Sequence, residues 1–146
     1  MKKWLSITEA HEKGTNAYHA TLPTDGLAQL RDAMQETAAF GFDTAKAAQQ
    51  ELGRRVRALL ENKGIKSVAA PGFQAPGVVV SYTDHLDWHN TRAFAAQGLQ
   101  IAAGVPLACD EPADYRSFRI GLFGLDKLKN IDRTVFNLEK ALNALL

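Results

Sequence analysis

Hydrophobic residues recur at helical spacing in the first half of the chain. One apolar stripe advances in steps of three and four: Leu27, Leu30, Met34 and Ala38. It predicts an amphipathic helix over about residues 24–39. A second stripe has similar spacing: Ala45, Ala48, Leu52, Val56 and Leu59. It predicts a helix over residues 43–63 that ends before Gly64.

The regions beside these helices carry weaker signals. A short amphipathic piece around Trp4–Lys13 ends at Gly14, and residues 15–24 have no clear period, which indicates an extended crossing segment. Three arginines flank the second apolar stripe: Arg54, Arg55 and Arg57. Such residues usually form a solvated helix face, so we expect them to be exposed.

After Gly64 the hydrophobic period changes to two. Four strands are predicted near residues 65–70, 77–83, 99–103 and 116–122. A weak helical pattern lies at 84–98, and the chain closes on a predicted helix over 130–145 that should cover the sheet. Because the connecting loops are too short for most parallel crossovers, the sheet should be mainly antiparallel.

The predicted fold is therefore of the α+β class. Two N-terminal helices precede a small, mainly antiparallel sheet in the order ββαββα, covered by helices. Residues 1–23 form the predicted crossing segment, and residues 24–146 form a domain that includes its two leading helices.

One strand carries a charge inside an apolar run, in the stretch SFRIGLFGLD from Ser117 to Asp126. Side chains alternate across a strand, so Phe118 and Ile120 should face the core, while Arg119 and Gly121 share the opposite face. A guanidinium beside a residue without a side chain leaves space for a ligand. From the residues alone, a structural ion pair of Arg119 remains the competing interpretation.

Composition limits the function classes. The 146 residues suffice for one domain with a sizeable core, and 17 Lys and Arg against 16 Asp and Glu indicate neither a nucleic-acid nor a membrane surface. No apolar run approaches the ~20 residues of a membrane span. The single cysteine, Cys109, fits a reducing compartment, so we expect a cytoplasmic protein.

Metal and nucleophile motifs are weak. His85 and His89 are four residues apart, but a closed zinc site needs about four ligands and no recognised spacing supplies them, so no metal is predicted. Cys109 fits a small core residue better than a nucleophile. Tyr18 and Thr21 are unusual polar residues in the irregular segment, where packing and turn roles stay open.

Two motifs resemble one enzyme family. The stretch AYHATLPTDGLAQLRDAM resembles the Tyr-His-x-Thr-x-Pro segment of class V, fold-type I, pyridoxal-phosphate-dependent aminotransferases. The stretch SFRIGLFGLDKLKNIDRTVFNLEKAL looks like the substrate-carboxylate strand and final helix of the same family. The alanine–glyoxylate and serine–pyruvate aminotransferases are the most similar branch. The two motifs keep the family's order, about a hundred residues apart.

The resemblance implies roles for three residues. Tyr18 and Thr21 would bind the phosphate of pyridoxal 5′-phosphate across the interface of a homodimer. Arg119 would bind the carboxylate of a small amino acid or a 2-oxo acid such as glyoxylate or pyruvate. The chain would then be the C-terminal small domain of an aminotransferase.

The resemblance also implies a missing part. None of the lysines lies upstream of the Tyr-His-x-Thr segment in the context expected for the Schiff-base lysine. We therefore expect the isolated chain to lack transaminase activity and not to bind the cofactor alone. The alternative is a stand-alone, non-enzymatic α+β module that binds a small carboxylate or a protein partner.

Overall fold

The computed structural model describes residues 1–18, 21 and 23–146. These residues form two compact units, Met1–Ala39 and Phe40–Leu146. His19, Ala20 and Leu22, which include two positions of the Tyr-His-x-Thr segment, lie outside the described residues.

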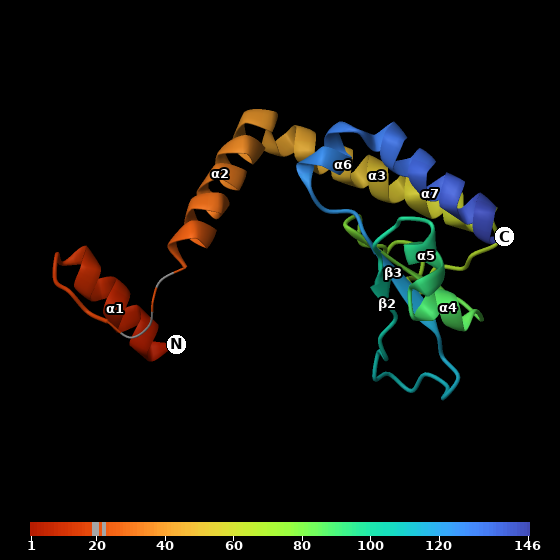
Figure 1. Ribbon diagram of the computed structural model, residues 1–146, viewed down its shortest axis with the longest axis horizontal. Coiled ribbons are helices and arrows are strands. Elements are labelled where there is room, and N and C mark those ends of the chain that lie inside the picture. Colours follow the sequence, from red (N-terminus) through yellow and green to blue (C-terminus); the bar gives the residue numbers. More distant parts are fainter. Residues whose placement is uncertain (19–20, 22) are drawn as a thin grey trace. The chain divides into compact units, whose positions relative to one another are not determined.

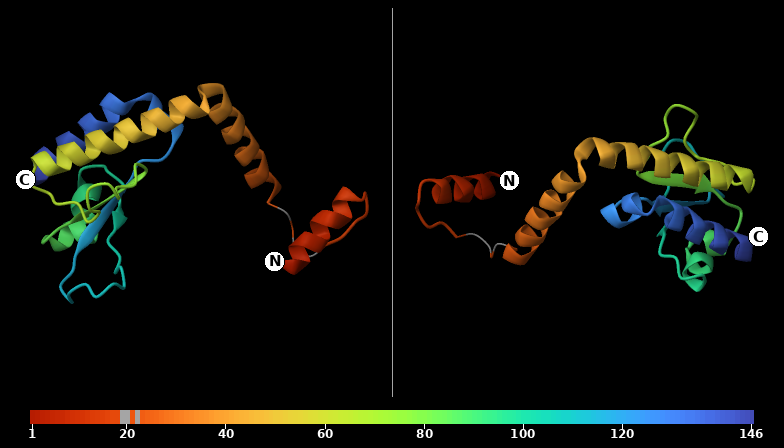
Figure 2. Two further views of the ribbon diagram at one scale, coloured as in Figure 1. Left: turned by 180° about the vertical axis from the view of Figure 1, so that it is seen from behind. Right: turned by 90° about the horizontal axis from the view of Figure 1, so that it is seen from above.

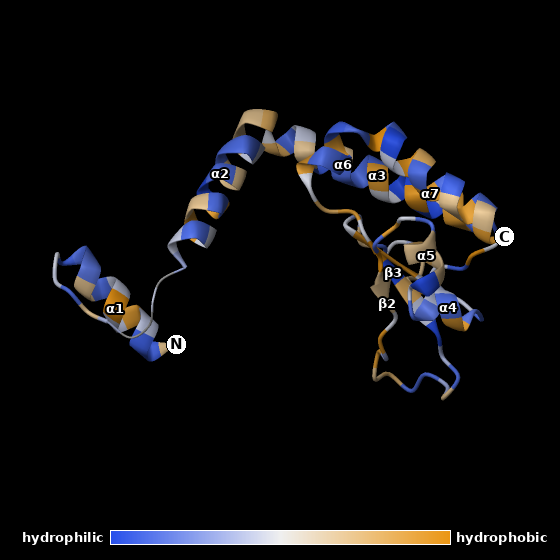
Figure 3. Ribbon diagram, viewed as in Figure 1, coloured by the Kyte–Doolittle hydropathy of each residue, from blue (hydrophilic) through white to orange (hydrophobic). Residues whose placement is uncertain are grey.

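The first unit is built from two helices, α1 (Lys2–Glu12) and most of α2 (Thr24–Phe40). The helix α1 is followed by Gly14, whose φ of 72° is the left-handed conformation that glycine adopts readily. The predicted helix over 24–39 is confirmed by α2. No described residue of α2 is buried, and its turns carry both hydrophobic and hydrophilic residues (Figure 3). Its predicted apolar stripe is therefore solvent-exposed.

The second unit contains all of the sheet and is shown in Figure 1. It begins with the predicted long helix, α3 (Phe42–Asn62), and Gly64 follows that helix with a φ of 76°. The remaining elements follow in chain order: β1 (Val78–Tyr82), α4 (Leu86–His89), α5 (Arg92–Ala96), β2 (Ala102–Ala103), β3 (Ser117–Gly121), α6 (Leu125–Lys129) and α7 (Ile131–Leu145).

The three strands form one antiparallel sheet in the order β1-β3-β2, so β3 is central. The predicted α+β class with a small antiparallel sheet is confirmed. The predicted strand at 65–70 is wrong, because only Ser67 forms an isolated bridge, to Ser81. The hydroxyl of Ser67 donates to the carbonyl of Ala69, 3.0 Å away, within the same segment.

The core lies between the sheet and two long helices. In Figures 1 and 2, α3 and α7 run side by side over the sheet. Phe94 and Phe118 are fully buried, and their rings contact Trp88 at centroid distances of 5.2 and 5.7 Å. The predicted helical region at 84–98 is two short helices, α4 and α5. The helix α7 adds Leu138 and Leu142 to the same core.

The helix α3 packs closely against the loop that precedes β1, and this contact gives a first prediction. A Cβ at Gly53 would lie 2.6 Å from the carbonyl oxygen of Pro76 and 2.8 Å from its Cα, so the backbone would have to move. We expect Gly53→Ala to lower the free energy of unfolding by about 2 kcal/mol. At Gly26 in α2, the nearest atom to a Cβ is Pro23 Cβ at 3.8 Å, and Gly26→Ala should cause no loss. Equal denaturation midpoints for the two variants would contradict the close approach.

Candidate functional site

The candidate site centres on Arg119 in the middle strand of the sheet. The neighbours Phe118 and Ile120 are 0% and 7% exposed and face the core, whereas Arg119 is half-buried and Gly121 is exposed. The predicted alternation of β3 is therefore confirmed. Arg119 is paired with Val80 of β1 on one side and Ala102 of β2 on the other.

The guanidinium of Arg119 has N–H groups without a hydrogen-bond partner among the described residues, and the strand face beside it is open. Its Nε donates to the carbonyl oxygen of Ala103 at 2.9 Å, and within the described residues Arg119 forms no ion pair. A Cβ at Gly121 would meet only Phe123 Cδ2, at 3.8 Å, so the same face is open there. Among the residues that the structure describes, the ion pair of Arg119 that was the competing interpretation is therefore not formed. The two Nη atoms can donate to a planar anion.

The start of β3, before Arg119, is fixed by contacts of Ser117 with Gly104 and His89. A Cβ at Gly104 would lie only 2.0 Å from the carbonyl oxygen of Ser117, so β2 and β3 approach at a distance that only glycine permits. The Nδ1 of His89 lies 2.9 Å from the same carbonyl and donates to it, and the N–H of Gly104 donates to the carbonyl of His89 at 3.3 Å. The helix α4 therefore fixes both strands beside the arginine.

The loop between β2 and β3 is held by a single carboxylate. Glu111 accepts hydrogen bonds from the backbone N–H groups of Cys109 at 2.8 Å, Ala108 at 2.9 Å and Leu107. The N–H groups of Cys109 and Ala108 contribute most to lowering the pKa of Glu111 to about 2. Ala108 and Asp110 have φ values of 57° and 63°, a left-handed backbone that these bonds stabilise.

The loop should loosen in acid. Because the folded pKa of Glu111 is about 2 against an ordinary value of 4.5, the carboxylate stabilises the loop above about pH 4.5. That stabilisation is lost as the pH falls toward 2. We expect hydrogen exchange at Ala108 and Cys109 to rise over this window, relative to the intrinsic rate. Glu111→Gln should show weaker protection without this acid dependence, and an identical pH profile in both proteins would contradict the role of the carboxylate.

The two other predicted site residues lie in the first unit. The hydroxyl of Tyr18 is 3.4 Å from Oγ1 of Thr21, and Tyr18 is 82% exposed. The structure thus brings these two hydroxyls together, as phosphate binding requires, while Arg119 belongs to the second unit. Their roles remain predictions.

Other candidate chemistry is sparse in the part of the chain that the structure describes. No group of three or more His, Cys, Asp or Glu residues is arranged to hold a metal ion among those residues. The thiol of Cys109 is exposed, so the expected core position is wrong. Among the same residues, no helix combines the length and the apolar character needed to cross a bilayer.

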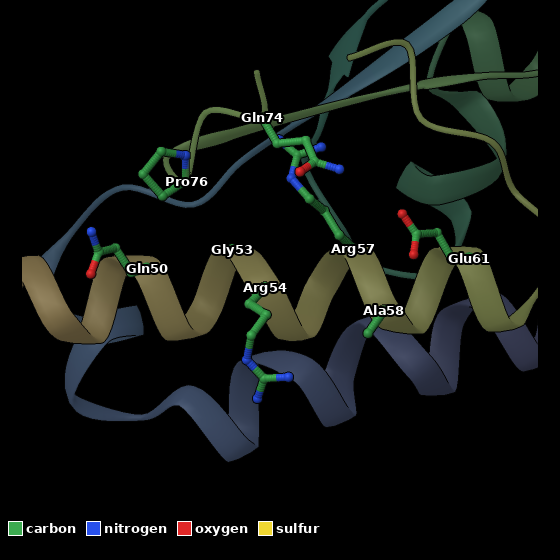
Figure 4. Close-up of a pocket in the computed structure, with 8 residues that line it drawn as sticks. All are labelled: Gln50, Gly53, Arg54, Arg57, Ala58, Glu61, Gln74 and Pro76. Carbon is green, nitrogen blue, oxygen red and sulfur yellow. The ribbon is translucent and has the colours of Figure 1, made fainter. Parts of the chain in front are cut away.

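Arg57 corrects another expectation, because it is only 8% exposed. Its Nη2 donates to the carbonyls of Ala75 at 2.7 Å and Val78 at 3.0 Å. Burial lowers the pKa of Arg57. Figure 4 shows Arg57 pointing from α3 toward the loop before β1, beside a pocket of about 410 Å³, while Arg54 points away. Arg57 therefore anchors this loop and is not part of a solvated helix face.

Comparison with known proteins identifies the fold. An alanine–glyoxylate aminotransferase from Nostoc sp. superposes with a TM-score of 0.65 at 20% identity, covering 86% of this chain and 33% of that one. A ureidoglycine–glyoxylate aminotransferase from Bacillus subtilis superposes with a TM-score of 0.70 at 20% identity, covering 96% and 36%. The fold is that of part of an aminotransferase. No family model and no curated protein sequence matches the chain.

The match covers only part of the aminotransferase structures. The chain spans about a third of the length of the aminotransferase structures that it matches, 33% and 36%. The predicted resemblance to the alanine–glyoxylate branch is thus confirmed at the level of fold, in agreement with a C-terminal portion. The sequence did not reveal the supporting groups around Arg119: the carbonyl of Ala103, the close approach at Gly104 and the carboxylate of Glu111. Only Gly104, a glycine directly after an alternating strand, left a signal.

Proposed function

We propose that this chain is the C-terminal part of a pyridoxal-phosphate-dependent aminotransferase that transfers an amino group between a small amino acid and a 2-oxo acid. The observation that carries the proposal is Arg119, which lies on the open face of the central strand. Within the described residues its guanidinium has no acidic partner. The aminotransferase fold of the two structural neighbours supports it.

Arg119 has the geometry for a substrate carboxylate. Two parallel charge-assisted hydrogen bonds from a guanidinium fix both the position and the plane of a carboxylate. A small amino acid, glyoxylate or pyruvate held in this way has its reacting carbon at a defined distance from the arginine. The role of Arg119 is to bind and orient the substrate.

The hydroxyls of Tyr18 and Thr21 fit a phosphate group. They lie 3.4 Å apart, within hydrogen-bonding distance of each other, in an exposed position, so the oxygens of one phosphate can bind both hydroxyls in place of that contact. Pyridoxal 5′-phosphate, when bound, supplies the electron sink of amino-group transfer. We propose that these hydroxyls hold its phosphate across a homodimer interface, in a crossing segment of residues 1–23 that precedes the domain of residues 24–146.

The remaining chemistry belongs to the rest of the aminotransferase fold. Amino-group transfer needs a lysine that forms a Schiff base and moves a proton at the substrate Cα. We propose that this lysine lies in the two thirds of the fold outside the match, that the complete enzyme acts on substrates such as glyoxylate or pyruvate, and that it works in the cytoplasm.

Absorbance with added cofactor tests the proposal. The isolated chain mixed with pyridoxal 5′-phosphate should show no protein-specific change in the visible absorbance of the cofactor and no amino-group transfer from alanine to glyoxylate. A polypeptide that joins this chain to the other two thirds of its aminotransferase fold should show both. A joined polypeptide that folds but shows neither would contradict the proposal and favour a stand-alone carboxylate-binding module.

A further inference from the structure

One hydrogen-bonding edge of the Arg119 guanidinium is already in use. A carboxylate can bind an arginine through Nε and one Nη, or end-on through both Nη atoms. In this structure Nε donates to the carbonyl oxygen of Ala103 at 2.9 Å. The other edge, formed by Nη1 and Nη2, has no hydrogen-bond partner among the described residues.

The Ala103 carbonyl, which accepts the hydrogen bond from Nε, is fixed by its neighbours in the sheet. Ala103 is paired with Phe118 in the ladder between β2 and β3. The next residue, Gly104, lies against the backbone of Ser117 so closely that a Cβ would be 2.0 Å from its carbonyl oxygen. Because the helix α4 also binds Ser117 through His89, this acceptor is attached to three elements.

We propose that the Ala103 carbonyl is a positioning group for Arg119, and that the ligand carboxylate binds end-on to Nη1 and Nη2. The inference rests on the proposed function, because it specifies how the same arginine receives its carboxylate. The carbonyl fixes the plane of the guanidinium before the ligand arrives, so fewer side-chain rotations are lost on binding. The ladder partners Val80 and Ala102 have no polar side-chain group that would compete for the free edge.

Nuclear magnetic resonance of the labelled 146-residue chain tests this arrangement. The scalar coupling transmitted through a hydrogen bond, here between Arg119 Nε and the carbonyl carbon of Ala103, is measured before and after saturation with pyruvate. We expect the coupling to be present in the free chain and retained on saturation, while the Nη signals of Arg119 shift. Arg92, whose side chain is exposed, serves as the control and should show neither effect.

The outcomes separate the two proposals. Loss of the coupling on saturation, with shifts at Nε, would overturn the end-on arrangement and leave carboxylate binding intact. Absence of the coupling in the free chain would overturn the positioning role of Ala103. A retained coupling without any pyruvate-induced shift at Arg119 would instead refute the proposed carboxylate-binding function.

Discussion

Replacing Arg119 by lysine in the proposed complete enzyme is expected to lower kcat/KM for amino-group transfer roughly ten- to a hundredfold. Lysine keeps the charge but loses the two parallel donors, and a hydrogen bond to a charged group contributes about 1.5–3 kcal/mol. The measurement is steady-state kinetics with alanine as amino donor and glyoxylate as acceptor. The loss should be of similar size for each substrate, since all of them carry the carboxylate.

A matched control separates the site from a general effect of arginine loss. Arg92 is exposed on α5, and Arg92→Lys should leave kcat/KM unchanged. Circular dichroism should show that both variants keep the fold, because Arg119→Lys removes only one hydrogen bond, to Ala103. Unchanged kinetics in Arg119→Lys would contradict the assignment of this residue.

Replacing Gly104 by alanine is expected to lower the free energy of unfolding by about 3 kcal/mol, the upper range for overpacking. A Cβ there would lie 2.0 Å from the carbonyl oxygen of Ser117 and 2.7 Å from its carbonyl carbon. Both are backbone atoms of β3, so the strand cannot yield by rotating a side chain. The shift should also disturb Ala103 and weaken carboxylate binding by Arg119.

Gly121, the last residue of β3, provides the control for this substitution. A Cβ at Gly121 would lie in ordinary contact with Phe123 Cδ2, at 3.8 Å. Urea denaturation should therefore place Gly121→Ala near the wild type and Gly104→Ala well below it. A Gly104→Ala protein with the wild-type midpoint would show that β2 and β3 do not approach so closely.

Features that depend on local periodicity could be predicted from the sequence. The predictions of two long helices, near residues 24–39 and 43–63, were correct because the apolar stripes extend over many residues. The faces of β3 were also correct, because a strand fixes the direction of Arg119 relative to Phe118 by geometry alone. The α+β class then follows from the order of the elements.

Features that depend on distant contacts could not be predicted. The burial of Arg57 depends on the carbonyls of Ala75 and Val78, which come close only when the loop folds back on α3. The predicted strand at 65–70 alternates like a strand but pairs with β1 only at one bridge, between Ser67 and Ser81, which two backbone hydrogen bonds close. Periodicity describes a segment, whereas pairing depends on its neighbours.

The candidate site shows the same division. The open face beside Arg119 follows from the alternation of β3 and from Gly121 having no side chain. The hydrogen bond from Arg119 Nε to Ala103 could not be predicted in this way, because it joins two strands separated by a long loop. Glu111 likewise depends on a left-handed loop backbone that no short pattern indicates.

If Arg119 binds a substrate carboxylate on the open face of the sheet, the chain should distinguish a charged ligand from an uncharged ligand of the same shape. The labelled chain is titrated with pyruvate and with pyruvamide, which has the same shape but no charge. We predict saturable shifts at Arg119 and its ladder partners Val80 and Ala102 with pyruvate, and none with pyruvamide. In Arg119→Lys the pyruvate-induced shifts at Val80 and Ala102 should be lost. Equal shifts with both ligands, or no shift at Arg119 with pyruvate, would rule out carboxylate binding by Arg119.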